Sequence, residues 1–554
     1  MSGKTVTPAS EVPVSRPAER RWRADALRSP VTVVIIAATL VALALRLFQL
    51  SRPGMLLGVT EYDDGPYFGS ALRLSSGVLP YRDFILVQPP GITLLMLPAA
   101  LLAKLTGTAW GMAFGRILTT LASAAGVALL GLLVRHRGVL ATLVACGTLA
   151  VFPYSIAAAH TVLVEAWLVL FCLAGALMVF DRDRLASGKR LVWGGVAFGF
   201  AGAIEPWAIV PVLVVFALCL PRVRRAATFA AGVAAGFLVP VLPFAALDPP
   251  RFYQSTIVAQ IGHRAAAVPV PMWTRLRYLT GLSDTHLVHR AALAAHLHLG
   301  QYAIVALTVA ALAVLIAGGL LAVVVVTSRP PAALEWFAAA STVLIVAMFL
   351  WPSQFHYHFP AFLAPFLALA IALPVARLVT LGRTRRASRP DQAKDAAGDW
   401  LQQAAVGGAV IVLVVLAAVQ AKSETALKAF ISQAGVAAAG KVIPAGSCVA
   451  TDMQTALILA NRFSSDVPGC PLMVDGIGTD LALSGGLKPA TGAGAVPAVA
   501  AVWRQEFTHA QFAWLSPHND RRIAWNPALW AYFTSNFTLV ENRYGDKVYQ
   551  RRRS

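Results

Sequence analysis

Long apolar segments alternate with short polar ones along most of the chain. Between residues 31 and 420 the apolar runs recur at a length of about 20 residues, which crosses about 30 Å of hydrocarbon. This pattern is typical of a polytopic α-helical membrane protein, and it predicts about eleven membrane-spanning helices. The expected spans are 31–50, 112–134, 139–154, 161–180, 191–204, 208–220, 227–247, 302–326, 333–351, 359–381 and 401–420.

One further apolar segment, Gly91–Gly107, decides the orientation of the chain. It contains Pro98 and Lys104, and we expect it to lie along the outer membrane interface, or to dip into it, without crossing. With the N-terminus in the cytoplasm, four basic clusters then fall on the cytoplasmic side, where Lys and Arg are favoured. A crossing segment would put all four outside. The clusters are Arg135–Arg137, Asp181–Arg190, Arg222–Arg225 and Arg383–Arg386.

Two segments with a different pattern flank the apolar part. Residues 1–30 are rich in Pro, Ser, Arg and Glu without a hydrophobic period, which predicts a disordered cytoplasmic tail. Residues 421–554 combine turn formers with short β-like runs, such as 471–475, and helix-like runs, which predicts an extracytoplasmic α/β domain of about 130 residues. In that compartment Cys448 and Cys470 are expected to form a disulfide. Its tryptophans are predicted to be core or membrane-interface residues rather than a carbohydrate surface: Trp503, Trp514, Trp525 and Trp530.

Composition supports the assignment to a membrane and argues against nucleic acid as a partner. With 57% hydrophobic and 13% charged residues, the 554-residue chain is too apolar for an ordinary soluble enzyme. A net charge of +20 is also found in nucleic-acid binders, but here Arg and Lys lie in short clusters between apolar runs, so no nucleic-acid partner is expected. The high Ala, Val, Gly and Arg usage is typical of a high-GC bacterium, and we therefore expect a bacterial plasma membrane.

Three carboxylates stand directly after the first expected span. Glu61, Asp63 and Asp64 form one acidic cluster, and charge held near hydrocarbon is costly and usually functional. The expected topology places this cluster outside the cytoplasm in outer loop 51–111, on the same side as outer loop 248–300 and the C-terminal domain. No nucleotides are supplied there, so a group-transfer enzyme must use a lipid-linked donor, such as a sugar on polyprenyl phosphate.

Such a transfer needs a carboxylate base for the acceptor hydroxyl and cations for the phosphate. His356 and His358 are candidates to bind phosphate or metal, but an i, i+2 spacing points to opposite helix faces, so only one is expected in the site. A divalent cation at Asp63 and Asp64 is an open alternative, and no cofactor is predicted to be required. Zinc is disfavoured in loop 248–300, where Asp284 is the only acid near His286, His289, His296 and His298. The cations at or outside the expected outer boundary are Arg46, Arg82, Arg116, His263, Arg264, Arg275 and Arg277.

Six motifs, in a characteristic order and spacing, carry a family resemblance. They are Arg46-Leu47, Asp63-Asp64-Gly65-Pro66-Tyr67, Leu79-Pro80-Tyr81-Arg82-Asp83-Phe84 with Gln88-Pro89-Pro90-Gly91, Phe114-Gly115-Arg116, His160 to Glu165, and Gln354-Phe355-His356-Tyr357-His358-Phe359-Pro360. Over residues 31–380 the chain resembles the GT-C superfamily of integral-membrane glycosyltransferases, in the branch of the protein O-mannosyltransferases and the aminoarabinose transferase of lipid A, of actinobacterial type. Two positions depart from the pattern. Asp64 replaces a Glu, and Glu205-Pro206-Trp207 occupies a turn where many members have a Lys.

The resemblance implies a GT-C-like transmembrane domain over residues 31–420 and an inverting sugar transfer. Asp63 is implied as the catalytic base and Asp64 as a support for the acceptor or a cation, although the choice of base between the two stays open. Donor-phosphate contacts are expected from Arg46, Arg82, Arg116 and Arg264. The residues expected to bind the acceptor, or to support the reacting groups, are Glu61, Tyr67, Glu165, His356 and His358.

Two other classes of function compete with a transferase. A transporter or flippase of lipid-linked sugars also needs polar residues at membrane depth, but here the acids cluster outside and no inverted repeat is visible. A non-catalytic membrane protein whose exported domain binds cell-wall polymer is the other alternative. A transferase would have a polyprenyl-phosphate sugar, membrane lipid and an acceptor as partners. We prefer a cell-wall polysaccharide or lipoglycan as the acceptor over protein, and mannose and arabinofuranose both remain open as the sugar.

Overall fold

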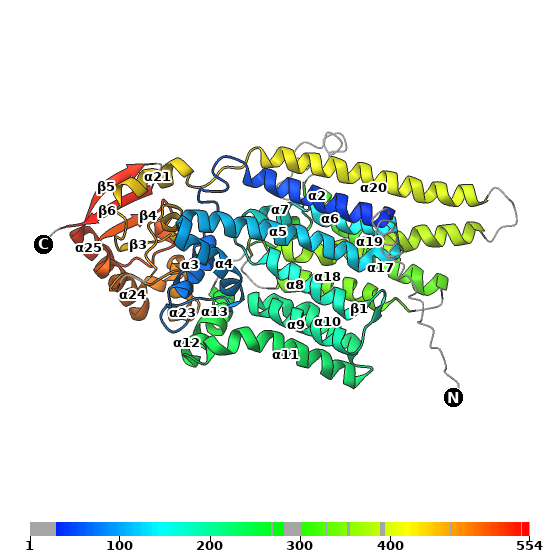
Figure 1. Ribbon diagram of the computed structural model, residues 1–554, viewed down its shortest axis with the longest axis horizontal. Coiled ribbons are helices and arrows are strands. Elements are labelled where there is room, and N and C mark those ends of the chain that lie inside the picture. Colours follow the sequence, from blue (N-terminus) through cyan, green and yellow to red (C-terminus); the bar gives the residue numbers. More distant parts are fainter. Residues whose placement is uncertain are drawn as a thin grey trace, which may run out of the picture.

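The computed structural model describes residues 29–266, 270–281, 301–327, 330–351, 355–387, 394–465, 468–543 and 546–552. An elongated helical body carries a smaller sheet-containing domain at one end (Figure 1). The predicted fold class, a polytopic helical protein with a C-terminal α/β domain, is confirmed. Three groups of expectations fall outside the described residues: the tail up to residue 28, the histidines at 286–298, and the side chains of His263 and Arg264.

The helices of the body run nearly parallel to its long axis (Figure 1). Seven described helices are long and apolar enough to cross a membrane, and α6 with α7, bent by 56° at their junction, makes an eighth candidate. Others are shorter, so the expected number of about eleven spans stays a prediction. The helices are α2 (Pro30–Leu50), α4 (Gly91–Thr106), α5 (Thr108–Val134), α6 (Val139–Val151), α7 (Pro153–Ala157), α8 (Glu165–Val179), α9 (Lys189–Ile204), α10 (Ile209–Cys219), α11 (Val223–Ala245), α17 (Gln301–Thr327), α18 (Ala333–Leu350), α19 (Pro360–Ala387) and α20 (Lys394–Glu424).

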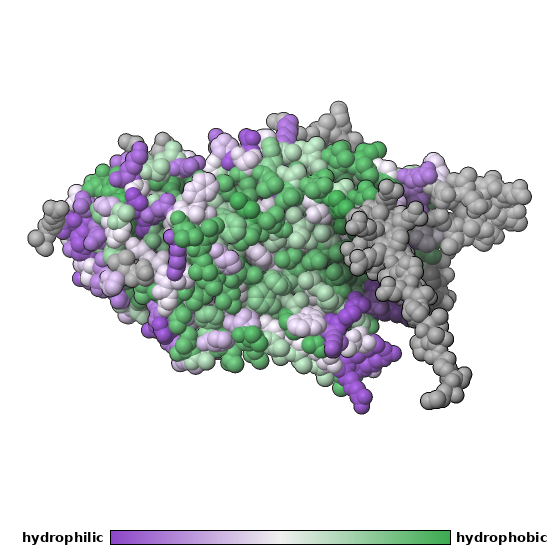
Figure 2. Space-filling view, viewed as in Figure 1, coloured by the Kyte–Doolittle hydropathy of each residue, from purple (hydrophilic) through white to green (hydrophobic). Residues whose placement is uncertain are grey.

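The surface of the body is suited to lipid. Figure 2 shows a broad hydrophobic area over the helices on the visible face, with hydrophilic residues gathered at the C-terminal domain and at the opposite end. On α20 the apolar side chains of Ile411 and Val414 are 66% and 61% exposed. A helix that leaves its apolar side chains uncovered by protein is expected to face hydrocarbon.

Two neighbouring helices of the body pack backbone to backbone through glycines. A Cβ on Gly199 of α9 would lie 2.1 Å from the Val233 carbonyl oxygen, and one on Gly236 of α11 would lie 2.1 Å from that of Val196. Only glycine permits this approach. The contact fixes α9, whose last residue precedes Glu205.

The basic clusters gather at the end of the body opposite the C-terminal domain. There Arg137 pairs with Asp183 at 2.9 Å and with Glu335 at 3.0 Å, and Arg377 reaches the same Glu335 carboxylate at 3.0 Å. Figure 1 shows strand β1 (Phe180–Asp181) at this end, whereas α4 and α3 (Asp64–Ser75) lie beside the C-terminal domain. The grouping of basic residues at one end agrees with the positive-inside pattern; which face of a membrane that end meets stays a prediction.

The C-terminal domain is built on a four-stranded sheet of order β3-β4-β6-β5. Strand β3 (Val449–Thr451) pairs parallel with β4 (Phe512–Leu515), and β6 (Asp546–Arg551) pairs antiparallel with both β4 and β5 (Phe537–Arg543). A parallel pair needs a long crossover, and here it contains helices. The helices of the domain are α21 (Gln433–Val442), α22 (Gln454–Leu459), α23 (Gly476–Ser484), α24 (Pro497–His509) and α25 (Pro527–Asn536).

In this domain the expected disulfide is present, two of the four tryptophans lie in the core as expected, and residues 471–475 do not form the expected strand. Cys448 and Cys470 form a disulfide. Trp503 and Trp514 are core residues, each 1% exposed, so neither belongs to a carbohydrate surface. Residues 471–475, expected to form a strand, instead lead into α23, where the Asp475 side chain caps the helix by accepting a hydrogen bond from Gly478 N. Side chains, rather than a neighbouring strand, bind the backbone of this segment: Gln454 Nε2 donates to Met473 O at 2.7 Å, and Arg73 donates to Pro471 O at 2.8 Å.

The domain docks tightly on the helical body. Helix α22 packs against α3, and Phe68 of α3 shares one hydrophobic core with Leu457 and Phe463. Arg73 of α3 also donates hydrogen bonds to the carbonyl oxygens of Ser464, Ser465 and Pro471, at 2.6, 2.7 and 2.8 Å. The junction of the two parts is therefore held by both apolar and polar contacts.

Candidate active site

A cavity of about 270 Å³ opens where the helical body meets the C-terminal domain. The body contributes the loop before α3, the first turn of α8, the ends of α9 and α18 and the turn before α19. The domain contributes α23 and two loops. Carboxylates dominate the ionisable groups in its wall: Glu61, Asp63, Glu165, Glu205 and Asp475, together with His356, His358, Lys488 and Arg522.

Asp63 lines this cavity from the N-cap position of α3. Within the described part of the chain no side chain or backbone group donates a hydrogen bond to its carboxylate. Burial, followed by the nearby Glu61 carboxylate, raises the pKa of Asp63 to about 8, against the opposing effect of His358. A carboxylate with a pKa near 8 and no hydrogen-bond partner can accept a proton close to neutral pH.

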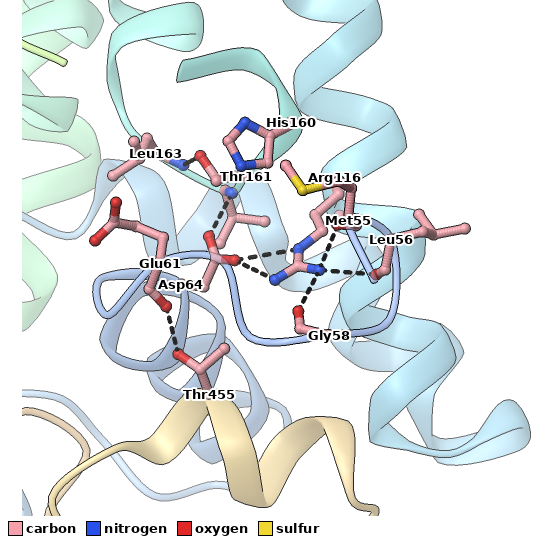
Figure 3. Close-up of polar contacts among 12 residues, drawn as sticks. Met55, Leu56, Gly58, Glu61, Asp64, Arg116, His160, Thr161, Leu163 and Thr455 are labelled. Atoms are coloured by element: carbon pink, nitrogen blue, oxygen red, sulfur yellow. Dashed lines mark hydrogen bonds and ion pairs between the residues drawn. The ribbon is translucent and has the colours of Figure 1, made fainter. Parts of the chain in front are cut away.

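Asp64, the next residue, does not line the cavity, and its side chain points toward Arg116 (Figure 3). Its Oδ2 accepts hydrogen bonds from Nη2 and Nε of Arg116 at 2.6 and 3.1 Å, and its Oδ1 accepts one from Val162 N at 2.8 Å. Both side chains of this ion pair are fully buried. Asp64 therefore ties the start of α3 to α5 and to the segment before α8.

Arg116 also holds the loop between α2 and α3. Its Nη1 donates to the carbonyl oxygens of Met55, Leu56 and Gly58 at 2.9, 2.8 and 3.0 Å (Figure 3). With Asp64 these acceptors occupy its guanidinium, and Arg116 does not line the cavity. In this geometry the residue shapes the loop of residues 51–63 between α2 and α3, called the acidic loop below, rather than offering free N–H groups to a ligand.

The acidic loop is also held from the side of the C-terminal domain. Thr455 Oγ1 donates to the carbonyl oxygens of Glu61 and Tyr62, each at 3.1 Å. A Cβ at Gly65 would lie 2.6 Å from Thr455 N, so only glycine fits where α22 crosses the start of α3. In the sequence Asp63-Asp64-Gly65, the glycine is therefore required by the close packing of α22 against α3. The two carboxylates have different surroundings.

Glu61 is fixed at the wall of the cavity by two donors. Tyr357 Oη donates to its Oε2 at 2.7 Å, and Tyr62 N donates to its Oε1 at 2.8 Å. Tyr67, which lies one turn into α3, also lines the cavity. These contacts keep a second carboxylate close to Asp63, and its charge raises the pKa of Asp63.

Glu165 and His358 form a buried pair in the same wall, with Oε1 2.5 Å from Nδ1. Burial by itself would lower the pKa of His358, but the Glu165 carboxylate overrides it and raises that pKa to about 9. His356 lines the cavity as well, its ring 5.6 Å from that of His358. The expectation that only one histidine would reach the site is wrong, because both precede α19 in a turn rather than a helix.

The arginines proposed for the donor phosphate lie elsewhere. Arg46 is fully buried, and its guanidinium donates to Ser123 Oγ at 2.8 Å and to the Ala42 and Ala150 carbonyl oxygens, each at 3.1 Å. Arg82 is exposed and paired with Asp83 at 2.8 Å. Neither lines the cavity, and nor does Arg116. The structure brings Glu61, Asp63, Tyr67, Glu165, His356 and His358 together and leaves these three arginines and Asp64 outside.

Sequence reasoning missed the part of the site that the C-terminal domain supplies. Asp475 accepts from Tyr62 Oη at 3.3 Å, and burial raises the pKa of Asp475 to about 6. Lys488 and Arg522 line the same side of the cavity. No motif marks these three residues, because only the fold brings them to the acidic loop.

A metal site is not evident at the acidic cluster. Over the described ranges, no group of three or more His, Cys, Asp and Glu side chains has an arrangement that would hold an ion. Of the two carboxylates considered for a divalent cation, Asp64 is already engaged by Arg116 and Val162. Only Asp63 of that pair faces the cavity.

Comparison with solved structures identifies the fold. The chain superposes on ArnT from Cupriavidus metallidurans bound to undecaprenyl phosphate with a TM-score of 0.57, at 14% identity, over 93% of this chain and 97% of that one. For the apo state of the same ArnT the TM-score is 0.57, at 15% identity over 96% and 98% of the two chains. The apo oligosaccharyltransferase of Archaeoglobus fulgidus gives 0.50, at 12% identity over 94% and 74%.

The chain therefore has the fold of GT-C membrane glycosyltransferases. This likeness covers nearly the whole chain, including the C-terminal domain. No protein-family model matches the sequence, and none of the curated proteins matches it.

Proposed function

We propose that this protein transfers a sugar from a polyprenyl-phosphate donor to an acceptor hydroxyl at the outer face of a bacterial plasma membrane. The observation that carries the proposal concerns the carboxylate of Asp63. It faces the cavity between the helical body and the C-terminal domain of a GT-C fold, and no described residue donates a hydrogen bond to it. The structurally similar ArnT binds undecaprenyl phosphate, which supports a lipid phosphate as the leaving group here.

In the proposed reaction Asp63 takes the proton of the acceptor hydroxyl as its oxygen attacks the anomeric carbon of the sugar. The new bond joins the acceptor oxygen to that carbon, and the bond from the carbon to the phosphate oxygen breaks. The polyprenyl phosphate leaves as an anion with both electrons of that bond. A single displacement of this kind inverts the configuration of the sugar.

The neighbours of Asp63 suit this role. A carboxylate is an effective general base when its pKa lies near the working pH, and burial together with Glu61 moves Asp63 into that range. The His358 cation, held by Glu165, opposes the negative charges of the wall. Asp64 keeps the backbone of Asp63 in place by binding Arg116.

The orientation follows from the distribution of charge. The end with the basic clusters is proposed to be cytoplasmic, which puts the cavity and the C-terminal domain outside. The disulfide between Cys448 and Cys470 fits an oxidising exterior. A cell-wall polysaccharide or lipoglycan is proposed as the acceptor, in keeping with that location.

A transfer assay tests the proposal directly. Membranes containing the protein are incubated with a panel of polyprenyl-phosphate pentoses and hexoses, and the products are analysed by mass spectrometry. We expect one donor to be consumed with formation of a glycosylated acceptor and free polyprenyl phosphate. If donors instead cross the bilayer intact, or bind without being consumed, the chain is a transporter or a binding protein and the proposal is wrong.

A further inference from the structure

We propose that Lys488 and Arg522, both supplied by the C-terminal domain, bind the phosphate of the lipid-linked donor. The inference rests on the proposed function and identifies which cations of this chain meet the leaving group. Among the described residues these two are the only Lys or Arg side chains in the cavity wall. The helical body alone would then hold an incomplete site.

The rest of the wall is unsuited to an anion. The carboxylates of Glu61, Glu205 and Asp475 share it with Asp63 and with the Glu165 that is already paired to His358. A phosphodiester placed among carboxylates is repelled unless fixed positive charge lies closer. Lys488 and Arg522 provide that charge beside the acidic loop, where Arg522 lies over the ring of Tyr62.

Lys488 has a fixed backbone and an uncommitted ammonium group. Its carbonyl oxygen accepts from Thr491 N and Ala493 N, each at 3.0 Å, and its own N–H donates to Thr491 Oγ1 at 2.8 Å. Burial lowers the pKa of Lys488, with the Asp63 carboxylate acting in the opposite direction. No described residue accepts a hydrogen bond from its Nζ, so a phosphate would satisfy donors that are otherwise only solvated.

Arg522 is held on one side and open on the other. Its Nη1 lies 3.3 Å from Ser516 Oγ and 3.6 Å from Asp452 Oδ2, and its guanidinium carbon lies 5.1 Å from the ring centroid of Tyr62. Nothing in the described structure accepts a hydrogen bond from its Nε or Nη2. A guanidinium fixed in this way presents two parallel N–H groups to a phosphate.

The two cations come from adjoining turns. Lys488 directly precedes the 3-10 turn η5 (Pro489–Thr491), and Arg522 directly follows the turn η7 (Asn519–Arg521). These turns pack against each other. The spacing between the two positive groups is therefore set within the C-terminal domain, and one ligand can meet both.

The test measures binding of undecaprenyl phosphate to the purified full-length protein in nanodiscs, with uncharged undecaprenol as the comparison ligand. We expect Lys488→Gln and Arg522→Gln each to weaken binding of the phosphate by about tenfold or more, and Lys488→Arg to restore most of it. Binding of undecaprenol should be the same in all variants. Matched controls are Lys441→Gln and Arg521→Gln, whose side chains are exposed in the same domain.

The outcomes separate this inference from the proposed function. Wild-type affinity in Lys488→Gln and Arg522→Gln, in a protein that still transfers sugar, would overturn the inference and leave the function standing. Equal loss of undecaprenol binding would also overturn it, since the variants would then have damaged the lipid site. Because Arg522 contacts Tyr62 and Ser516, melting curves accompany each variant, and Lys488 decides the result if Arg522→Gln fails to fold.

Discussion

Asp64 and Arg116 form a fully buried ion pair, in which the carboxylate Oδ2 lies 2.6 Å from the guanidinium Nη2. Because of this pair the side chains of the two neighbouring acids point in different directions: Asp64 points into the protein, and Asp63 faces the cavity. It also joins the loop after α2, the start of α3 and α5 into one unit (Figure 3). Of these two acids, Asp64 is engaged inside the protein, and Asp63 is the one proposed to act as the base.

Removing one partner of the buried pair should therefore damage the fold. Asp64→Asn leaves the Arg116 charge buried without its counter-ion, a loss of about 3–5 kcal/mol for pairs of this kind. We expect Asp64→Asn to lower the melting temperature clearly in detergent, whereas Asp63→Asn keeps the wild-type value. If Asp64→Asn melts like the wild type and only loses activity, its assignment to structure is wrong.

The pH dependence of transfer should report Asp63. Since the base works when deprotonated and its pKa is raised to about 8, kcat/KM should rise with pH up to that region. Glu61→Gln removes a negative charge that raises this pKa, so the rising limb should move to lower pH. The measurement is the pH profile of both proteins. A limb that stays in place, or moves to higher pH, would contradict the role of Glu61.

The ion pair of Glu165 and His358 should determine the alkaline limb of the pH profile of kcat/KM. The carboxylate raises the pKa of His358 to about 9, so the histidine is a cation across the neutral range and loses its proton only above it. Glu165→Gln removes that support, which lowers the pKa of His358 and should bring the alkaline fall in kcat/KM to lower pH. Glu335→Gln, at the far end of the body, is a matched control that should leave the profile unchanged.

The disulfide should stabilise the C-terminal domain. Cys448 and Cys470 are separated by 22 positions in the sequence, and closing a loop of that size stabilises a fold by about 3 kcal/mol. A Cys448→Ser, Cys470→Ser double variant should melt at a lower temperature than the wild type. Cys219→Ala, at a free buried cysteine of the helical body, should lower it by less. Equal melting of all three proteins would show that the bond adds no stability.

The class of fold was accessible from the sequence because apolar length and Arg distribution are local signals. The acidic loop after the first span could be predicted for the same reason, because charged residues next to an apolar run are recognisable in a short stretch of sequence. The disulfide followed from two cysteines in a polar segment. None of these inferences depends on which segments meet in space.

The cations of the site were not accessible in this way. Their positions relative to the expected membrane boundary made Arg46, Arg82 and Arg116 equal candidates for binding the donor phosphate. In the structure each guanidinium is bound to another residue of the protein, and the sequence does not reveal these contacts. Lys488 and Arg522 lie more than 400 residues from Asp63 in the chain and carry no motif. A residue that is brought to a site by the packing of one domain against another is not marked by any pattern in the sequence.

In the proposed reaction Asp63 accepts the proton of the acceptor hydroxyl, and the variant Asp63→Asn removes this ability while keeping the shape of the side chain. Purified wild type and variant are given the polyprenyl-phosphate sugar that the donor panel selects, and both donor binding and product formation are measured, with Asp181→Asn at the opposite end as the control. We expect Asp63→Asn to bind the donor as tightly as the wild type and to transfer sugar at least about a hundredfold more slowly. Transfer at the wild-type rate by Asp63→Asn would contradict the role of Asp63 as the base.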